Sequence, residues 1–479
     1  MRSHVCILSA AVCILSALAC GAPQAQGEPS AVAATSQPAA VAGDAPAPAR
    51  MESLLDFRSV VQQAKDKVFP AVVFIKCLRG SHESGKRISQ EVSGSGVLIS
   101  PSGELLTNWH VVDKAIEIRC LLHDGRSYSA ELIGTDKDTD LALLKLKLAA
   151  GDAPVPFAEL GDSAALHEGD FVMAMGAPWG LSRSVSIGIV SCTRRYLPDA
   201  SEYSYWLQTD ASICPGNSGG PLVNTDGRIV GINARGALSG GDMGFAIPSA
   251  TIVRIVSRLR EKGQMDWTWT GIQLQPLRDF DRDVYFDAAE GVIVAETDPD
   301  SPARRAGLLE RDRIVRINGA AVTATTAEDL PDVRVVLGTL AKESPAVIDL
   351  VRNGQEMTIE LVPREKGCVE GEELDCPRWD LTVKAINQFD NPDLHFQRAE
   401  GVFIFGVKYP GNASLAGLES KDILLQVGDA KIDTMDDVRA AHKQALENMA
   451  ADHKVLVTVL RNGLMQQVIL DFSRDFEKE

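Results

Sequence analysis

Basic residues are scarce in this sequence. The 479 residues contain 48 Lys and Arg against 65 Asp and Glu, so the formal net charge is −17 at pH 7, and no basic run interrupts the acidic balance. Because nucleic acids bind surfaces with excess positive charge, this composition excludes nucleic acid as an expected partner. The 45% of hydrophobic residues is an ordinary globular share that can fill the cores of several domains.

The sequence also lacks a hydrophobic run long enough to cross a bilayer. Val5–Ala19 is shorter than the roughly 20 apolar residues of a transmembrane helix, but it suits the core of a signal peptide over residues 1–19. Leu18–Gly21 resembles the lipobox of bacterial lipoproteins, which is cut before its cysteine. We therefore expect an exported protein that begins at Cys20, and Cys20 either carries a lipid anchor or remains a bare thiol.

Residues 20–50 contain few large apolar side chains and consist mainly of Ala, Pro, Gln, Gly and Ser. Such a segment cannot bury enough apolar surface to become ordered, so it is predicted to be a disordered tether. The tether either spaces the folded domains from a lipid anchor or is a spacer with no anchoring role.

No cysteine spacing matches a zinc-binding pattern, and no metal or other cofactor is expected. Cys368 and Cys376 lie eight residues apart in what would be an oxidising compartment, so they either close a disulfide loop or remain two thiols. The other cysteines beyond the tether are Cys77, Cys120, Cys192 and Cys214.

Residues 51–265 read as one mostly β domain. Apolar residues at helical spacing predict a helix over Met51–Lys67, and a second helix is expected at Ile252–Lys262. Between them, short β-rich runs broken by Gly, Asp and Ser predict two packed β-barrels. The twelve expected strands are Val72–Cys77, Gly96–Ile99, Leu105–Asn108, Ile116–Leu122, Tyr128–Ile133, Leu141–Leu146, Phe171–Met175, Ser184–Thr193, Tyr205–Thr209, Pro221–Asn224, Ile229–Ala234 and Gly244–Ala246.

The rest of the chain repeats itself at an offset of about 110 residues. Gly291–Val294 matches Gly401–Ile404, and Ala306–Leu308 matches Ala416–Leu418. A repeat of this length predicts two homologous modules. We place them at residues 266–364 and 379–476, joined by an acidic linker over residues 365–378.

Three residues of the β domain suggest a nucleophilic site. His110 follows a predicted strand, Asp140 precedes another, and Ser218 lies in a glycine-rich loop. A serine hydroxyl attacks once a base removes its proton, imidazole can be that base near neutral pH, and a carboxylate fixes the imidazole tautomer. The order His, Asp, Ser is that of chymotrypsin, and it places the serine in the second barrel. We therefore expect catalysis in the cleft between the barrels.

The loop Cys214–Pro221 is expected to supply an oxyanion hole. Glycines around a serine permit a tight turn in which backbone N–H groups converge on one point. We expect this hole at Gly216, Asn217 and Ser218, and a plain glycine-rich turn is the alternative for the loop taken alone.

These motifs jointly resemble the HtrA/Deg serine endoproteases, in particular the DegP-like branch with two PDZ domains. The resemblance implies a chymotrypsin-like, or trypsin-like, double β-barrel followed by two α+β PDZ domains. The matching segments are Gly94–Ile99, Thr107–Val111, Asp140–Ala142, Leu207–Ala211, Gly216–Pro221, Gly227–Asn233 and Gly244–Pro248, followed by Ser301–Ala303 and Ala306–Leu308 in the first module.

The resemblance also implies a function. Members of this family cleave unfolded exported proteins without ATP, as part of protein quality control in the periplasm. They assemble as homotrimers or larger oligomers, and their PDZ domains capture C-terminal peptides by β-augmentation.

Several positions depart from the family pattern. Ser212 and Ile187 are expected at the specificity pocket, where they favour small aliphatic substrate residues. Cys214 stands where Asn is usual, and we expect a small buried side chain there, with a disulfide as the alternative. The segment Leu78–Ser93 is short for the long regulatory loop of some relatives. Cys77 and Cys120 would lie on neighbouring barrel strands, where they either form a bridge or stay reduced.

The two modules are expected to differ in peptide binding. Gly271, Ile272 and Gln273 suit a carboxylate-binding loop with a permissive glycine, so C-terminal peptides are expected at the first module. The counterpart Asp380–Val383 lacks the glycine and adds a carboxylate, so the second module is expected to serve assembly more than capture.

Three alternatives to a quality-control protease remain open from the sequence. One is a regulatory protease that acts when a PDZ ligand binds. Another is a chaperone or scaffold with little proteolytic turnover. The last is a PDZ adaptor with an inactive protease domain, against which the intact His, Asp and Ser argue.

Overall fold

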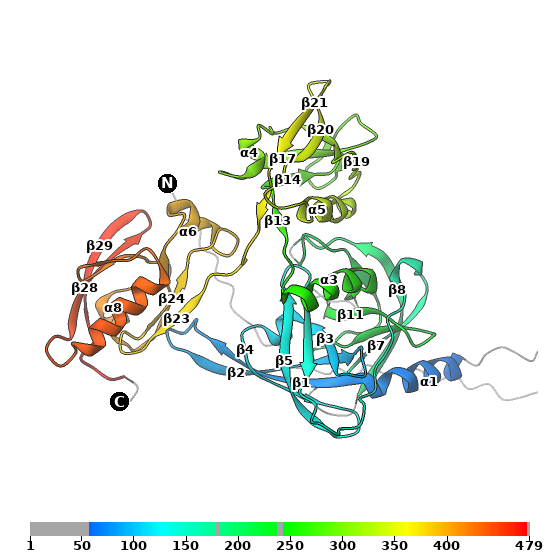
Figure 1. Ribbon diagram of the computed structural model, residues 1–479, viewed down its shortest axis with the longest axis horizontal. Helices are drawn as coiled ribbons and strands as arrows, with labels where there is room; N and C mark the ends of the chain where they lie inside the picture. Colours follow the sequence, from blue (N-terminus) through cyan, green and yellow to red (C-terminus); the bar gives the residue numbers. More distant parts are fainter. Residues whose placement is uncertain (1–56, 179–182, 199, 237–242, 477–479) are drawn as a thin grey trace, which may run out of the picture. The chain divides into compact units, whose positions relative to one another are not determined.

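The computed structural model describes residues 57–178, 183–198, 200–236 and 243–476 (Figure 1). The predicted signal peptide, tether and lipidation site Cys20 therefore lie outside the described residues. The described part of the predicted first helix is α1 (Phe57–Val68), which continues into the 3-10 turn η1 (Phe69–Ala71) around Pro70. Within the described residues, no helix combines the length and apolar character needed to span a membrane.

Both predicted barrels are present and closed. The first has the strand order β1-β2-β3-β6-β5-β4 and the second β10-β11-β12-β9-β8-β7. The first barrel comprises β1 (Val72–Ser81), β2 (Ile88–Leu98), β3 (Glu104–Asn108), the short helix α2 (Trp109–Val112), β4 (Ala115–Leu121), β5 (Ser127–Asp136) and β6 (Leu141–Leu146). The second comprises the 3-10 turn η2 (Ser163–Ala165), β7 (Phe171–Gly176), β8 (Ser184–Arg195), β9 (Trp206–Thr209), β10 (Pro221–Asn224), β11 (Ile229–Gly236) and β12 (Gly244–Pro248).

The closing helix α3 (Ser249–Lys262) packs against β5 and β6 of the first barrel and β11 of the second. Its buried Ile252, Ile255 and Leu259 recur at the spacing of one helix face, which is why the sequence predicts it well. The helix ends at Gly263, whose φ of 73° is the left-handed conformation that glycine adopts at low cost.

The segment Leu78–Ser93, predicted to be a loop, is instead largely strand. β1 and β2 continue as one antiparallel ladder to the pair Ser81 and Ile88, which leaves only residues 82–87 at the tip. The prediction was wrong because it relied on an alternation of apolar and polar residues, which a half-buried strand shows. The side chains of residues 88–91 are all exposed, so this part of β2 lacks that alternation.

Neither of the two cysteine pairs considered from the sequence forms a disulfide, and Cys214 is also a free thiol. β1 does pair with β4, but Cys77 lies opposite Ile118 and Cys120 lies opposite Ile75. The cysteines are therefore diagonal neighbours, about 7–8 Å apart in a typical sheet, which is beyond the usual reach of a disulfide. Cys376 is buried in a module core whereas Cys368 is exposed, so this pair also remains as thiols.

The first module contains a sheet ordered β14-β17-β18-β20-β21, with β19 beside β18. Its elements are β13 (Thr268–Trp269), β14 (Ile272–Gln275), β15 (Arg278–Asp279), β16 (Val284–Tyr285), β17 (Val292–Thr297), α4 (Pro302–Arg305), β18 (Arg313–Ile317), β19 (Ala320–Ala321), η4 (Ala327–Asp329), α5 (Leu330–Gly338), β20 (Ala346–Arg352), β21 (Gln355–Leu361) and β22 (Arg364–Glu365).

The second module repeats this order as β24-β25-β26-β28-β29 and adds β23 at the edge, beyond β24. In both modules one Arg bridges a buried Asp: Arg352 donates to Asp312, and Arg461 donates to Asp422. The elements are β23 (Glu373–Cys376), β24 (Leu381–Ala385), α6 (Pro392–Gln397), β25 (Val402–Val407), α7 (Asn412–Ala416), β26 (Ile423–Val427), β27 (Ala430–Lys431), α8 (Met435–Glu447), β28 (Lys454–Arg461) and β29 (Leu464–Asp471).

Candidate active site

His110 and Asp140 are brought together by neighbouring strands of the first barrel. β3 pairs with β6 so that Asn108 lies opposite Leu141, which sets the residues just beyond both strand ends side by side. The backbone carbonyl of Asp140 accepts hydrogen bonds from the Trp109 amide at 3.0 Å and from Asn108 Nδ2 at 3.1 Å. These contacts fix Asp140 in a left-handed conformation with a φ of 56°.

The carboxylate of Asp140 contacts the Nδ1 edge of the His110 imidazole. Nδ1 lies 2.9 Å from both carboxylate oxygens, and the His110 backbone amide donates to Oδ1 at 3.1 Å. The carboxylate is buried, whereas the imidazole is 40% exposed. Because Nδ1 faces the carboxylate, Nε2 is the nitrogen left to exchange a proton with a reacting group.

The loop that carries Ser218 is held between the two barrels. The carbonyl of Ser218 accepts from the Ser95 amide of β2 at 2.8 Å, and the Gly219 amide donates to Asn233 of β11 at 2.8 Å. A Cβ added at Gly94 would meet both the side chain of Val111 and the carbonyl of Ser218. The residue that follows His110 and the backbone of Ser218 therefore lie against the same glycine.

The Ser218 hydroxyl is oriented away from a proton transfer to His110. Its Oγ donates to the backbone carbonyl of Ala234 at 3.0 Å. Since a base can take only the proton that is directed at it, activation requires this side chain to rotate and exchange the carbonyl for the imidazole. The structure thus brings the three predicted residues to one region but connects only two of them by a hydrogen bond.

Of the three oxyanion donors expected in the loop Cys214–Pro221, two are free amides in the described structure. Gly216 has a φ of 102°, and among the described residues neither its amide nor that of Ser218 donates a hydrogen bond. The amide of Asn217 instead donates to the Cys214 carbonyl at 2.9 Å, and its Oδ1 accepts from Ser184. Asn217 therefore shapes the turn in the conformation described, and its role as an oxyanion donor stays a prediction.

The prediction of a buried Cys214 was wrong. The residue lies at the outer side of the turn, where its thiol is exposed and contacts Ser212 Oγ at 3.3 Å. Ile187, the other expected pocket residue, is 45% exposed on β8. Its neighbour Gly188 lies against Ala211, the residue before Ser212, so the two expected pocket residues are on adjacent backbone segments.

Ser95 and Asn233 were not singled out from the sequence, yet both organise the loop. The hydroxyl of Ser95 donates to the Gly216 carbonyl at 2.5 Å and accepts from the Ala177 amide at 2.8 Å. Asn233 donates through Nδ2 to the carbonyls of Met175 and Pro221. The signal that could have found them is a polar residue within an otherwise buried strand.

The turn that precedes Asp140 is fixed from the outside. Asp136 accepts from Thr139 Oγ1 at 2.5 Å and from Trp267 Nε1 at 3.0 Å. Burial and the nearby Asp138 raise the pKa of Asp136 to about 6, against the effect of these two hydrogen bonds. Lys366, from the linker after the first module, contacts both oxygens of Asp138 at 3.0 Å. The turn is thus contacted by a residue at the start of the first module and by a residue just after its end.

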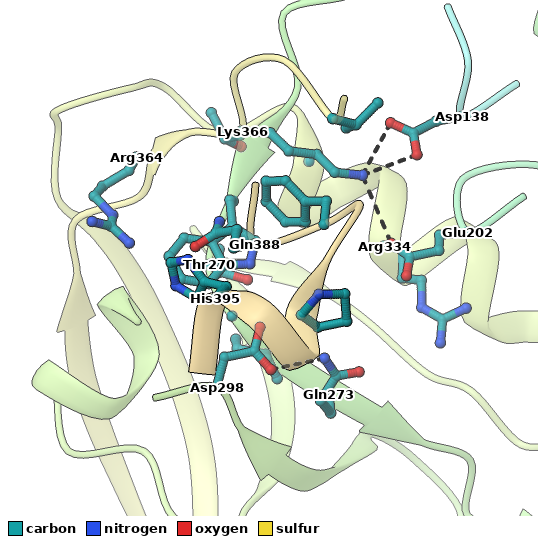
Figure 2. Close-up of a pocket in the computed structure, with 18 of the residues that line it drawn as sticks. Asp138, Glu202, Thr270, Gln273, Asp298, Arg334, Arg364, Lys366, Gln388 and His395 are labelled. Atoms are coloured by element: carbon teal, nitrogen blue, oxygen red, sulfur yellow. Dashed lines mark hydrogen bonds and ion pairs between the residues drawn. The ribbon is translucent and has the colours of Figure 1, made fainter. Parts of the chain in front are cut away.

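The predicted peptide-binding residues lie at the open edge of the first module. Gly271 has a φ of 71°, and a Cβ there would come within 2.2 Å of Ser301 Cβ, so only glycine fits. Ile272 begins the edge strand β14, and Gln273 donates to Asp298 at 2.9 Å. A pocket of about 1080 Å³ adjoins these residues, and Figure 2 shows Gln273 and Asp298 on one of its sides and Lys366 on another.

Comparison with known proteins agrees with this architecture. Residues 94–232 match the trypsin-like peptidase domain, and residues 270–362 match the PDZ domain. The chain is 34% identical over 389 residues to a probable periplasmic serine endoprotease DegP-like of Halomonas elongata, covering 79% of this chain and 78% of that protein. A protein of the same description from Marinomonas sp. is 35% identical over 378 residues, with 77% of each chain covered.

A solved structure, the HtrA-type protease AlgW with tripeptide, superposes with a TM-score of 0.55 at 32% identity, and the match covers 64% of this chain and 97% of that chain. The two closed barrels lie where the peptidase domain matches, and the first module lies where the PDZ domain matches, in the same order along the chain. The relatives are named as proteases of the same kind. The chain therefore belongs to the HtrA/DegP-like family and is a serine endopeptidase.

Proposed function

We propose that this protease degrades unfolded exported proteins without ATP, by means of a triad of His110, Asp140 and Ser218. The observation that carries the proposal is the contact of His110 Nδ1 with both oxygens of a buried carboxylate, next to a glycine-shaped serine loop. A buried carboxylate stabilises the imidazolium that forms when the serine loses its proton.

The proposed reaction begins with rotation of the Ser218 hydroxyl from Ala234 toward His110 Nε2. The imidazole takes the hydroxyl proton as Oγ attacks the scissile carbonyl, and the free amides of Gly216 and Ser218 stabilise the oxyanion. His110 then gives the proton to the leaving amine, which leaves an acyl-enzyme. Water, activated by the same imidazole, hydrolyses this ester and restores the serine.

The first module is proposed to capture peptide substrates. β14 is an edge strand in the described sheet, and the loop before it turns on Gly271, whose φ of 71° is left-handed. An extended peptide would add to β14 as a further strand, with its C-terminal carboxylate at the amides of Gly271 and Ile272. Ser212 and Ile187 would favour small aliphatic residues at the cleavage site.

The relatives are named periplasmic, which supports export of this chain to the periplasm. We further propose lipidation at Cys20, a homotrimer or larger assembly, and a chaperone contribution toward substrates that are held without cleavage. These proposals come from the sequence motifs and the family relationship.

A peptide-activated regulatory protease is the second candidate function. The observation that favours it is the hydrogen bond of Ser218 Oγ to Ala234, because this orientation holds the nucleophile away from its base. Ligand binding at the first module could act on the triad through Trp267 and Lys366, which contact the turn before Asp140.

Digestion of unfolded casein separates these functions. The wild type, Ser218→Ala and the control Ser257→Ala, at an exposed position of α3, are assayed with and without a C-terminal peptide. Quality control predicts activity without peptide, and the regulatory function predicts activity only with peptide. No activity in either case, or activity that survives Ser218→Ala, contradicts the proposed triad.

A further inference from the structure

The peptide-binding edge of the second module is already occupied by the chain itself. We propose that residues 372–377 are an internal ligand that fills this groove, so that the second module is a peptide-binding site for extended segments in which an acidic residue precedes a small apolar residue by three positions. This inference goes beyond the proposed function, because it concerns a groove that proteolysis does not require.

The backbone of β23 takes the place that an added peptide strand would have. Cys376 pairs with Leu381 and Glu373 pairs with Lys384, in an antiparallel ladder along the outer side of β24. An external peptide would need the same backbone donors and acceptors of β24. The groove is therefore closed to peptides as long as β23 stays in place.

Helix α8 holds the segment from its other side. His442 Nε2 donates to the carbonyl of Pro377 at 2.7 Å, and the His442 ring meets the Trp379 ring edge-on at 4.8 Å. Arg439 of the same helix forms an ion pair with Glu372. The segment thus lies between a strand and a helix, as a bound peptide does in helix-flanked grooves that extend a sheet.

The side chains of the segment match the groove. Cys376 has no exposed surface and belongs to the hydrophobic core that also contains Leu381, Val383 and Val438. Burial raises the pKa of its thiol, so it acts as a small neutral anchor. Three residues earlier, Glu373 contacts the buried Lys384 at 3.3 Å. These two positions define the ligand class: an acidic residue three positions before a small apolar one.

The same glutamate also contacts the first barrel. Glu373 lies 2.5 Å from Nζ of Lys114, the residue before β4, and 2.9 Å from Nδ1 of His82, at the tip of the β1–β2 hairpin. The carbonyl of His82 accepts from Thr382 Oγ1, on β24 itself. Two lysines and a histidine therefore contact the Glu373 carboxylate, and release of the segment would exchange these partners for water.

The carboxylate loop of the second module is satisfied internally as well. Asp380 occupies the position of Gly271 and is left-handed, with a φ of 56°. Its carboxylate accepts from the Asn412 amide at 2.9 Å and from Lys408 Nζ at 3.2 Å. A ligand carboxylate would meet this fixed negative charge, which explains why the internal ligand continues through Pro377 rather than ending there.

The first test counts peptides bound per chain. The full chain carries Ser218→Ala to prevent digestion. Two fluorescein-labelled peptides copy residues 370–375 and end in valine: the acid probe has a free C-terminal carboxylate for the first module, and the amide probe has a C-terminal amide, which Asp380 does not repel. Fluorescence anisotropy titration should give one acid probe and no amide probe per chain. Cys376→Asp places a charge at the buried anchor and should release β23, so that one amide probe binds per chain, whereas Cys376→Ala should bind none. An amide probe bound without the aspartate, or none bound to a folded Cys376→Asp chain, would overturn the proposal.

A second measurement does not require a substitution at Cys376. Hydrogen exchange of the peptide-free Ser218→Ala chain should show the outward amides of β24 protected by β23, whereas the outward amides of β14 exchange rapidly and become protected when the acid probe is added. Rapid exchange along β24 that slows with the amide probe would contradict an internal ligand. Neither measurement reads proteolysis, so a failure of the triad would leave this result unchanged.

Discussion

The two modules share their strand order but differ in how the loop before the edge strand meets the following helix. In the first, Gly271 makes room for the side chain of Ser301; in the second, Gly411 makes room for the side chain of Asp380, and a Cβ on Gly411 would lie 2.7 Å from Asp380 Cβ. In the first module the glycine of this contact precedes the edge strand, whereas in the second module it precedes the helix. One framework can thus hold either an open carboxylate loop or one that its own aspartate satisfies.

The largest expected effect on peptide binding comes from reversing this exchange. Gly271→Asp should lower peptide affinity at least about 100-fold, because its Cβ would overlap Ser301 and its carboxylate would repel the ligand carboxylate. Adding Ser301→Gly should restore the thermal stability of the module but not its peptide binding. Calorimetry and peptide titration of the two variants measure these effects, and recovered binding in the double variant would show that sterics alone distinguish the modules.

The equivalent Arg–Asp ion pairs of the two modules test whether they stabilise their modules equally. Arg352→Met and Arg461→Met each leave a buried aspartate without its partner, so each should cost about 3–5 kcal/mol in its own module. Arg461 also contacts Glu419 at an exposed position, which should add at most about 1 kcal/mol. Urea unfolding, monitored by hydrogen exchange, measures the free energy of unfolding of each module separately. Lys443→Met, on the exposed face of α8, is the control. A cost below 1 kcal/mol at either bridge would contradict the comparison.

The contacts of the two modules with the first barrel should respond to pH with opposite signs. Asp136, which accepts from Trp267, has a pKa raised to about 6, so the fold binds its proton more tightly than the unfolded chain. Stability should therefore fall as pH rises between about 4 and 6, by on the order of 3 kcal/mol. For Glu373, burial opposes ionisation, but Lys114 and Lys384 outweigh it and lower the pKa. Its contribution is present above the usual glutamate pKa and is lost as pH falls below it.

Unfolding midpoints of Asp136→Asn and Glu373→Gln between about pH 2 and pH 7 measure this difference, because the Glu373 change lies below the usual glutamate pKa of about 4.3. The aspartate variant should lack the fall in stability with rising pH, and the glutamate variant should lack the gain. Parallel pH curves for the wild type and either variant would contradict the assignment of that group.

The smallest expected difference concerns two buried tryptophans. Trp267→Phe leaves Asp136 Oδ1 without its donor and should cost about 1–3 kcal/mol beyond the packing loss. Trp379→Phe should cost only the packing loss, because its Nε1 has no hydrogen-bond partner among the described residues. Denaturation of both variants compares the two costs directly, and equal costs would mean that the Asp136 contact adds nothing.

The sequence predicted most of what depends on local pattern. Alternating apolar residues and turn residues located both barrels, and the settings of His110 and Asp140 next to strand ends indicated that their side chains would meet. The glycine-rich setting of Ser218 and its order after His110 and Asp140 indicated the nucleophile, but the direction of its hydroxyl depends on a rotamer that no sequence pattern encodes.

What could not be predicted depends on contacts between distant segments. The polar residues of β2 form a long ladder because β1 supplies the partner strand, not because of their own propensity. The acidic linker contains β23, whose four residues become a strand only against β24. The exposure of Cys214 follows from the path of one turn, which residue type alone does not determine.

The position of Ser95 has a consequence for dividing this enzyme into fragments. Its hydroxyl and amide, both on the first barrel, hold a loop that belongs to the second. A chain cut at the exposed turn near Gly151 would yield two pieces, each with a complete ring of strands, yet the nucleophile loop would lack its support until the halves reunite. Such a pair could serve as a complementation reporter that stays silent when its halves are apart.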